Sequence, residues 1–282
     1  MTVVRVPAST ANLGPGFDAL GMALDIYADV GVIDESASER ESAMAKKAVD
    51  EHHPASIAFA AAGGAGSLWV RSPIPIGRGL GFSGAMRVGG AAAAVVQQSG
   101  SEGVLAARGH DVLAVAAELE GHADNVAASL YGGIVATDGV TAVRVETPLR
   151  PDVVMWIPDT TTATTVSRAA LPESVPFEDA VFNIGRTALL VAALAGGDLA
   201  ALASATQDRL HQDRRLAAVA ESRTALEAGV AAGAWCGWLS GSGPTVALLT
   251  AGGDGQRLAK QLPEHGTVKI VAVDRAGTTV VG

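Results

Sequence analysis

The 282-residue sequence has one cysteine, few aromatic residues and no excess of basic charge. The single Cys236 excludes an internal disulfide and is typical of a reducing compartment. The chain has 20 lysines and arginines against 29 acidic residues, a net charge of −9, which argues against a nucleic-acid partner because such a partner needs a basic face. It does not exclude a phosphate ligand, because one loop can bind an anion on an acidic protein.

Long hydrophobic runs are also missing. The most apolar stretches are broken by glycines and are too short to span a bilayer. The first residues lack the charged and apolar segments of a signal peptide. We therefore predict a cytoplasmic protein with no membrane partner.

The residues that are present indicate a globular chain with a large core. Apolar residues make up 49% of the sequence and charged residues 17%. Strand and helix patterns are mixed without a regular βαβ period, which favours an α+β fold over a doubly wound parallel sheet. The stretch "TPLRP" is typical of a link between two halves, so we predict two domains, 1–150 and 151–282.

Residues 79–85, "GLGFSGA", have the G-x-G-x-x-G spacing of a dinucleotide-binding turn. That turn needs a strand leading directly into the first glycine and an acid about 20 residues later at a strand end. Here Pro73 and Pro75 interrupt the approach to Gly79, and the acid near that distance, Glu102, lies in "SGSEG". The flanking sequence therefore argues against a nicotinamide-dependent oxidoreductase, which stays the weakest alternative.

The same glycines are suited to a simpler phosphate loop. They let the backbone turn its amides toward one point, and a helix begins there, whose free N–H groups and dipole favour an anion. Ser83 can offer a hydroxyl to a phosphate or a metal. On these residues alone, a phosphate loop and a plain glycine-rich turn before a helix are equally good interpretations.

Six stretches in order, taken together, resemble one family. Three of them are similar to the motifs of the GHMP small-molecule kinases: "PASTANLGPGFDALGMAL" (7–24), "PIGRGLGFSGAM" (75–86) and "LSGSGPTVALL" (239–249). Within that superfamily the first is similar to the homoserine kinase family, as are "EGHADNVA" (120–127), "SRAALP" (167–172) and "DRLHQDRR" (208–215). The resemblance spans residues 5 to about 250.

The resemblance implies a fold and a reaction. The fold is a two-domain α+β GHMP-kinase fold, with a ribosomal-S5-like N-terminal domain, a ferredoxin-like C-terminal domain and the active site between them. The reaction is the phosphorylation of the side-chain hydroxyl of L-homoserine by ATP with Mg²⁺, giving O-phosphohomoserine for threonine synthesis. The family is commonly dimeric, so a homodimer is possible.

The resemblance also implies which residues bind the amino-acid substrate. A carboxylate suits guanidinium groups and an ammonium suits oxygen acceptors. The residues that match the family's substrate-binding positions are Asn12, Asp18, His122, Asn125, Thr164, Arg168 and Arg215. The ordinary alternatives are solvated surface charges for the two arginines and turn caps for the first two residues.

A second group of residues matches the positions that act on ATP. Glu120 and Ser83 match the Mg²⁺-binding pair, and Asp124 lies where it can accept the hydroxyl proton, although its ordinary role would be a helix cap. Phosphoryl transfer depends mostly on positioning and charge stabilisation, so the reaction does not require a base. The nucleotide phosphates are assigned to Gly77, Arg78, Gly79, Leu80, Gly81, Phe82, Ser83, Gly84 and Ala85.

The sequence departs from the family pattern in three places. Phe82 replaces the first serine of G-L-G-S-S-A, and Ala123 replaces the proline of H-P-D-N. The region 31–70 is short, and the asparagine that the family places near the adenine is not found there. Two alternatives therefore stay open: another GHMP kinase acting on mevalonate, pantoate or a related alcohol, and a degenerate member that binds a ligand without catalysis.

Overall fold

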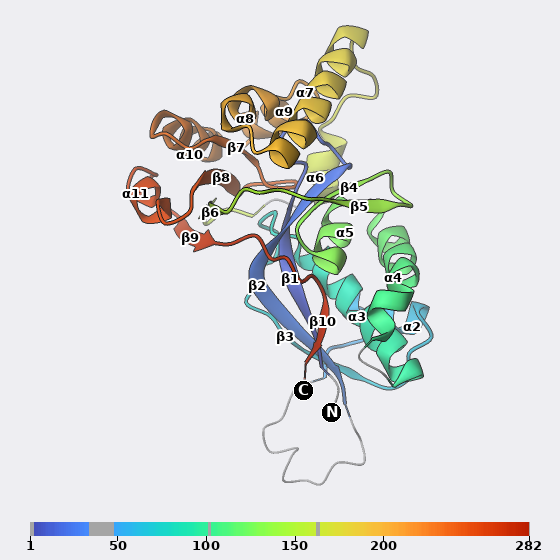
Figure 1. Cartoon of the computed structure of the whole chain (residues 1–282). Coiled ribbons are helices and arrows are strands. Elements are labelled where there is room, and N and C mark those ends of the chain that lie inside the picture. Colours follow the sequence, from blue (N-terminus) through green and yellow to red (C-terminus); the bar gives the residue numbers. More distant parts are fainter. Residues whose placement is uncertain (1–2, 34–47, 101–102, 162–163, 282) are drawn as a thin grey trace.

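The computed structural model describes residues 3–33, 48–100, 103–161 and 164–281. Two antiparallel sheets organise these residues (Figure 1). The first sheet has the order β10-β1-β2-β4-β5, and β3 pairs with β2. Its strands are β1 Val3–Ala11, β2 Leu20–Val32, β3 Leu68–Arg71, β4 Ile134–Thr137, β5 Ala142–Val145 and β10 Thr279–Val281.

The second sheet has the order β7-β8-β6-β9. Its strands are β6 Pro151–Ile157, β7 Cys236–Leu239, β8 Val246–Ala251 and β9 Thr267–Val271. Every pairing between strands of the described residues is antiparallel. The predicted α+β class is confirmed, and the parallel sheet of a dinucleotide-binding domain is not found among them.

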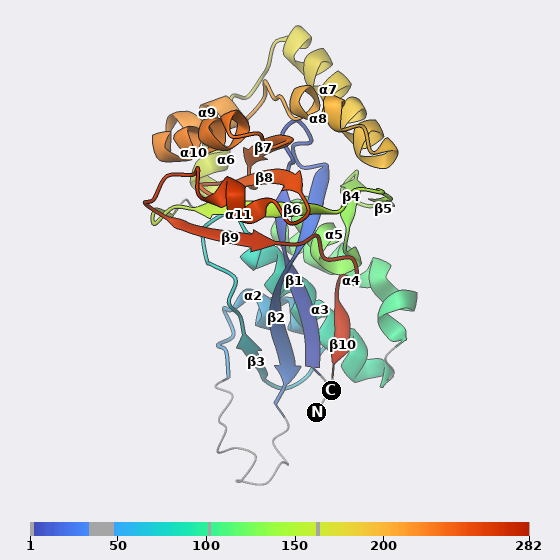
Figure 2. The ribbon, with the colours of Figure 1, turned by 60° about the vertical axis from the view of Figure 1, so that its left-hand side comes forward.

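Four helices lie on one side of the first sheet, two of them packed on its strands and two packed mainly on those helices (Figures 1 and 2). They are α2 Pro54–Ala61, α3 Phe82–Ser99, α4 Val104–Glu120 and α5 Asp124–Tyr131. Helix α3 is buried along most of its length because its alanines and glycines allow close approach. A Cβ atom at Gly89 would lie 2.6 Å from a methyl carbon of Val30 on β2. These small residues set how closely α3 lies on the sheet, and so where its first turn is held.

The remaining helices surround the second sheet. They are α6 Thr164–Ala169, α7 Phe177–Gly196, α8 Leu199–Ala205, α9 Gln212–Ala217, α10 Ala220–Ala231 and α11 Gly255–Ala259. Among the described helices, α7 is long and apolar enough to cross a membrane by length and composition, a weak criterion that soluble helices also meet. The absence of a membrane partner therefore stays a prediction.

The last strand, β10, returns to the first sheet. Its residues pair antiparallel with β1, so that Val3 lies opposite Val281 and Arg5 opposite Thr279. The chain therefore crosses from the second sheet back to the first after β9 (Figure 2). The division of the chain into domains 1–150 and 151–282 stays a prediction. Under that division, β10 would belong to the second domain but pair with β1 of the first.

Candidate active site

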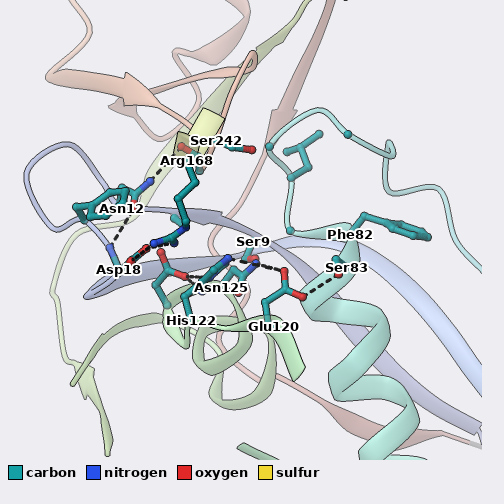
Figure 3. A pocket seen from close by; sticks show the side chains of 18 of the residues that line it. Ser9, Asn12, Asp18, Phe82, Ser83, Glu120, His122, Asn125, Arg168 and Ser242 are labelled. Atoms are coloured by element: carbon teal, nitrogen blue, oxygen red, sulfur yellow. Dashed lines mark hydrogen bonds and ion pairs between the residues drawn. The ribbon is translucent and has the colours of Figure 1, made fainter. Parts of the chain in front are cut away.

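A pocket between the two sheets collects residues from six parts of the chain (Figure 3). The β1–β2 loop, the loop before α3 and the α4–α5 turn come from the N-terminal half. Helix α6, helix α9 and the loop between β7 and β8 come from the C-terminal half. Sequence positions more than 200 residues apart therefore line one cavity, with Asn12 and Gly241 in hydrogen-bond contact at 3.0 Å.

The loop 77–81 runs along one wall of this pocket and leads into α3. Gly77, Gly79 and Gly81 all have positive φ angles, of 67°, 76° and 68°, which only glycine adopts readily. Gly81 is the N-cap residue of α3 and makes no side-chain hydrogen bond to it. The N–H groups of the first helical turn, at the pocket, are therefore not capped by a side chain. This is the backbone arrangement that binds a phosphate.

A serine of the β7–β8 loop holds the glycine loop in place. The Ser240 hydroxyl donates to the carbonyl oxygen of Gly79 at 2.6 Å, and it lies 2.8 Å from the hydroxyl of Thr10. A side chain at Gly79 would collide with the backbone of Ser240. The two halves of the chain are therefore joined directly at the loop.

The side chain of Phe82 packs beside the glycine loop. It is the first residue of α3, is half-buried, and meets the ring of His53 edge-on at 6.2 Å between ring centres. Figure 3 shows its side chain pointing away from the cluster formed by Asp18 and Arg168. The ring is thus accommodated beside the loop, and the loop keeps its turn.

Ser83 and Glu120 meet at the end of α4. The Ser83 hydroxyl donates to Oε2 of Glu120 at 2.7 Å, and the Asn125 amide lies 3.4 Å from Oε1. The predicted metal-binding pair is therefore brought together. Hard oxygen donors of this kind suit Mg²⁺, which binds through one or two protein oxygens and keeps waters and phosphate oxygens as further ligands.

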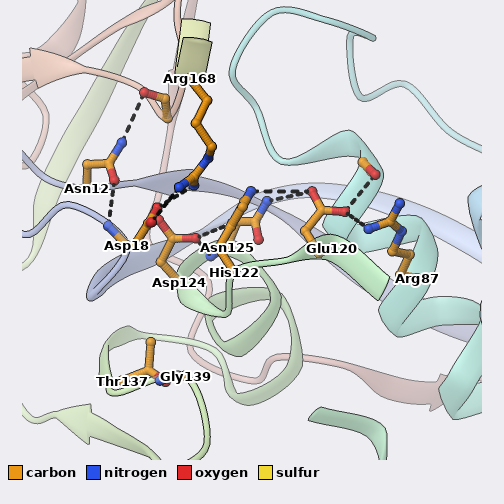
Figure 4. Close-up of polar contacts among 12 residues, drawn as sticks. Asn12, Asp18, Arg87, Glu120, His122, Asp124, Asn125, Thr137, Gly139 and Arg168 are labelled. Carbon is orange, nitrogen blue, oxygen red and sulfur yellow. Dashed lines mark hydrogen bonds and ion pairs between the residues drawn. The ribbon is translucent and has the colours of Figure 1, made fainter. Parts of the chain in front are cut away.

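Arg87 also contacts this carboxylate, and the sequence analysis missed it. Its guanidinium lies 2.6 Å from Oε2 of Glu120 (Figure 4). The sequence indicated its role only through its position: Arg87 follows Ser83 by one helical turn, which places both residues on one face of α3.

His122 and Asp124 form a pair beside Glu120. Nδ1 of His122 lies 2.9 Å from Oδ1 of Asp124, which also accepts the backbone N–H of Asn125 at 2.7 Å. Burial opposes a charge on His122, but the bond to Asp124 and the charges of Asp124, Glu120 and Asp18 raise the pKa of His122 above 6.5. The Asp124 carboxylate, in a residue that is 2% exposed, is therefore held in a fixed orientation by the His122 ring and the backbone N–H of Asn125.

Asp18 and Arg168 close the opposite side of the pocket. The guanidinium donates to both carboxylate oxygens at 2.8 Å, a bidentate pair that raises the pKa of Arg168. Asp18 has a φ of 57°, and its backbone N–H donates to Oδ1 of Asn12 at 3.1 Å. Asn12 therefore orders the β1–β2 loop and ties it to Gly241.

Arg215 is buried and lacks an acidic partner. Its side chain donates to Nδ1 of His211 at 3.2 Å and to the carbonyl oxygen of Gly241 at 3.1 Å. No carboxylate of the described residues forms an ion pair with it, and its Nε has no hydrogen-bond partner. Burial and the charge of Arg168 lower the pKa of Arg215, while the more distant charges of Asp18, Asp208 and Asp124 oppose that shift.

Phe17 contacts both arginines and was also missed by the sequence analysis. The guanidinium carbons of Arg168 and Arg215 lie 5.3 Å and 5.1 Å from its ring centre. Thr164, predicted to bind substrate, is the first residue of α6, and its side chain lies outside the described part of the structure. The other predicted site residues line the same pocket, apart from Arg78, Gly84 and Ala85.

Comparison with known proteins defines the class to which this fold and pocket belong. The family model of the GHMP kinases N terminal domain matches residues 43–133, and that of the GHMP kinases C terminal domain matches residues 190–268. The two sheets described above form the two-part fold of these kinases, as predicted.

Individual relatives narrow the class to one family. A homoserine kinase of Moorella thermoacetica is 37% identical over 301 residues and covers 100% of both chains. A homoserine kinase of Thermus thermophilus is 41% identical over 258 residues, covering 88% of this chain and 87% of the relative. The crystal structure of homoserine kinase from Cytophaga hutchinsonii matches with a TM-score of 0.81 at 25% identity, over 99% of this chain and 97% of that one. The chain belongs to the homoserine kinase family.

Proposed function

We propose that this chain transfers the γ-phosphoryl group of ATP to the side-chain hydroxyl of L-homoserine, giving O-phospho-L-homoserine. The family membership supports the reaction, and the uncapped first turn of α3 beside the glycine loop supports a phosphate site at residues 77–85.

One observation carries the assignment of the substrate. Arg215 is 6% exposed and forms no ion pair with an acidic side chain of the described residues. Arg168 contacts the same Phe17 ring. A buried charge without a partner is costly, and two neighbouring guanidiniums repel each other. The carboxylate of an amino acid placed between them relieves both costs, whereas the ammonium of that amino acid is suited to Asp18.

The substrate hydroxyl then lies toward the α4–α5 turn. The hydroxyl oxygen forms a bond to the γ-phosphorus, the bond from that phosphorus to the β–γ bridging oxygen breaks, and the hydroxyl proton is released. Asp124 is the acceptor within the pocket, and His122 holds its carboxylate in place. Because the transition state is loose, we assign these residues mainly to positioning, together with Asn12 and Asn125.

Glu120 and Ser83 would hold Mg²⁺ in this reaction. A bound Mg²⁺ supplies charge neutralisation on the ATP phosphates. The donor set fits it, because both residues present oxygen atoms to one point. Their position on α4 and α3 fixes that point at the end of the glycine loop.

Consumption of ATP by the purified protein tests the proposal directly. We expect coupled-assay turnover that depends on L-homoserine. Turnover with mevalonate or pantoate in its place would favour another GHMP kinase activity, and binding of homoserine or ATP without turnover would favour a degenerate ligand-binding member. Either outcome would overturn the proposal.

We also propose a homodimer, and a cytoplasmic location consistent with the single cysteine. Helix α7 exposes Phe177, Val181 and Ile184 on one face, at 85%, 52% and 69%. Exposed apolar clusters of this kind mark interaction surfaces. Sedimentation velocity on Ile184→Glu should show a monomer, and a wild-type monomer at micromolar concentration would contradict the proposal.

Replacement of Phe82 tests what the ring does at the phosphate loop. We expect Phe82→Ser to lower the KM for ATP about fivefold relative to Phe82→Ala, since one hydroxyl–phosphate hydrogen bond contributes about 1 kcal/mol. Both variants should lose about 1–2 kcal/mol of stability in urea melts because the ring is half-buried. Equal KM values in the two variants would show that position 82 does not face the phosphates.

A further inference from the structure

The carboxylate proposed to hold Mg²⁺ already has a cationic partner within the chain. Arg87 reaches Glu120 from α3, one turn after Ser83, because helical side chains tilt toward the N-terminus of their helix. Its guanidinium therefore lies at the phosphate-loop end of the helix. Figure 4 shows Arg87 on the side of Glu120 away from His122.

The contacts of the two carboxylate oxygens are unequal. Oε2 accepts both the Arg87 guanidinium at 2.6 Å and the Ser83 hydroxyl at 2.7 Å. Among the described residues, Oε1 has only the Asn125 amide at 3.4 Å and the His122 ring at 4.0 Å. The oxygen shared with Ser83 is thus the one that Arg87 occupies.

The pair is protected from solvent. The Arg87 side chain is 20% exposed and that of Glu120 9%. Charges that are partly buried are screened much less by water and salt than surface charges. A divalent cation on Glu120 would lie a few ångströms from the guanidinium and be repelled by it.

We propose that Arg87 is a resident cation that competes with Mg²⁺ for Glu120 and thereby sets the metal concentration the enzyme needs. This rests on the proposed function, in which Glu120 and Ser83 hold the metal. Arg87 is a positioning residue: it acts through Glu120 and keeps a positive charge beside the phosphate loop before the metal binds. Removing its charge should strengthen metal binding, the opposite of what loss of a supporting residue would do.

Mn²⁺ binding to the full chain, measured by electron paramagnetic resonance with a non-hydrolysable ATP analogue present, tests the proposal. We expect Arg87→Met to bind Mn²⁺ about tenfold more tightly than wild type, with the half-saturating Mg²⁺ concentration in the kinase assay falling in parallel. Arg87→Gln, which is neutral but keeps a donor, should tighten binding as well. Arg108→Met removes an exposed arginine near the far end of α4 and should leave the Mn²⁺ affinity unchanged.

Unchanged or weaker Mn²⁺ binding in both neutral Arg87 variants, with melting curves that show folded protein, would overturn the proposal. Glu120→Gln separates this failure from that of the proposed function. If Glu120→Gln keeps the wild-type Mn²⁺ affinity, the metal site itself is misplaced. If Glu120→Gln loses Mn²⁺ affinity and the Arg87 variants do not bind Mn²⁺ more tightly, only the proposed competition is wrong.

Discussion

Arg215→Lys is expected to raise the KM for L-homoserine about 100-fold, with a much smaller change in kcat. Nδ1 of His211 and the carbonyl oxygen of Gly241 hold one guanidinium nitrogen of Arg215, a residue that lines the pocket. Lysine keeps the charge but cannot make both contacts and also form a paired hydrogen bond to a carboxylate. Charge-assisted hydrogen bonds of this kind contribute about 1.5–3 kcal/mol each.

Steady-state kinetics at saturating ATP measure the effect. Arg214→Lys is the matched control, because Arg214 is the neighbouring residue on α9 but is exposed, and its KM should equal that of wild type. An equal rise in the KM for ATP, or wild-type kinetics in Arg215→Lys, would show that Arg215 does not bind the substrate carboxylate.

Glu120→Gln is expected to lower kcat/KM at least about 100-fold at millimolar Mg²⁺. The amide keeps the shape of the side chain and can still accept from Ser83, but it removes the negative charge that Mg²⁺ needs. Loss of one charge-stabilising group in an active site typically costs about two to three orders of magnitude in rate. The variant also leaves Arg87 without its acidic partner.

Raising Mg²⁺ should recover part of the lost activity, because weaker metal binding is offset by concentration. Glu118→Gln is the control: Glu118 is on the same helix, is exposed, and should give wild-type rates. Near-wild-type kcat at low Mg²⁺ in Glu120→Gln would show that the metal is held elsewhere.

The site was largely predictable where its residues lie in short contiguous motifs. The glycines at 77, 79 and 81 have positive φ angles, which only glycine adopts readily, so their spacing encodes the turn. The α4–α5 turn likewise carries Glu120, His122 and Asp124 within five positions, and a turn of that length brings them together. The α+β class followed from the irregular order of strand and helix patterns for a similar reason, since pattern is a local property.

Residues that act through distant neighbours were not predictable. Phe17 lies inside the stretch 7–24 and Arg87 just after the stretch 75–86, but their roles depend on contacts with Arg168, Arg215 and Glu120. The return of β10 to pair with β1 joins the two ends of the chain, and three residues of extended pattern give no indication of their partner. The place of the Phe82 ring beside His53 depends in the same way on how α2 packs against α3.

The sequence by itself determined the phosphate-loop backbone, the family and the identity of the charged groups, because these depend on local conformational preference and residue chemistry. Only the tertiary structure decided how those charges are paired. Ion pairing depends on distances between segments that packing brings together: Asp18 pairs with Arg168 and Glu120 with Arg87, whereas Arg215 is buried with no acidic partner among the described residues. The unpaired Arg215 at the proposed substrate site and the paired Glu120 at the proposed metal site both result from that pairing.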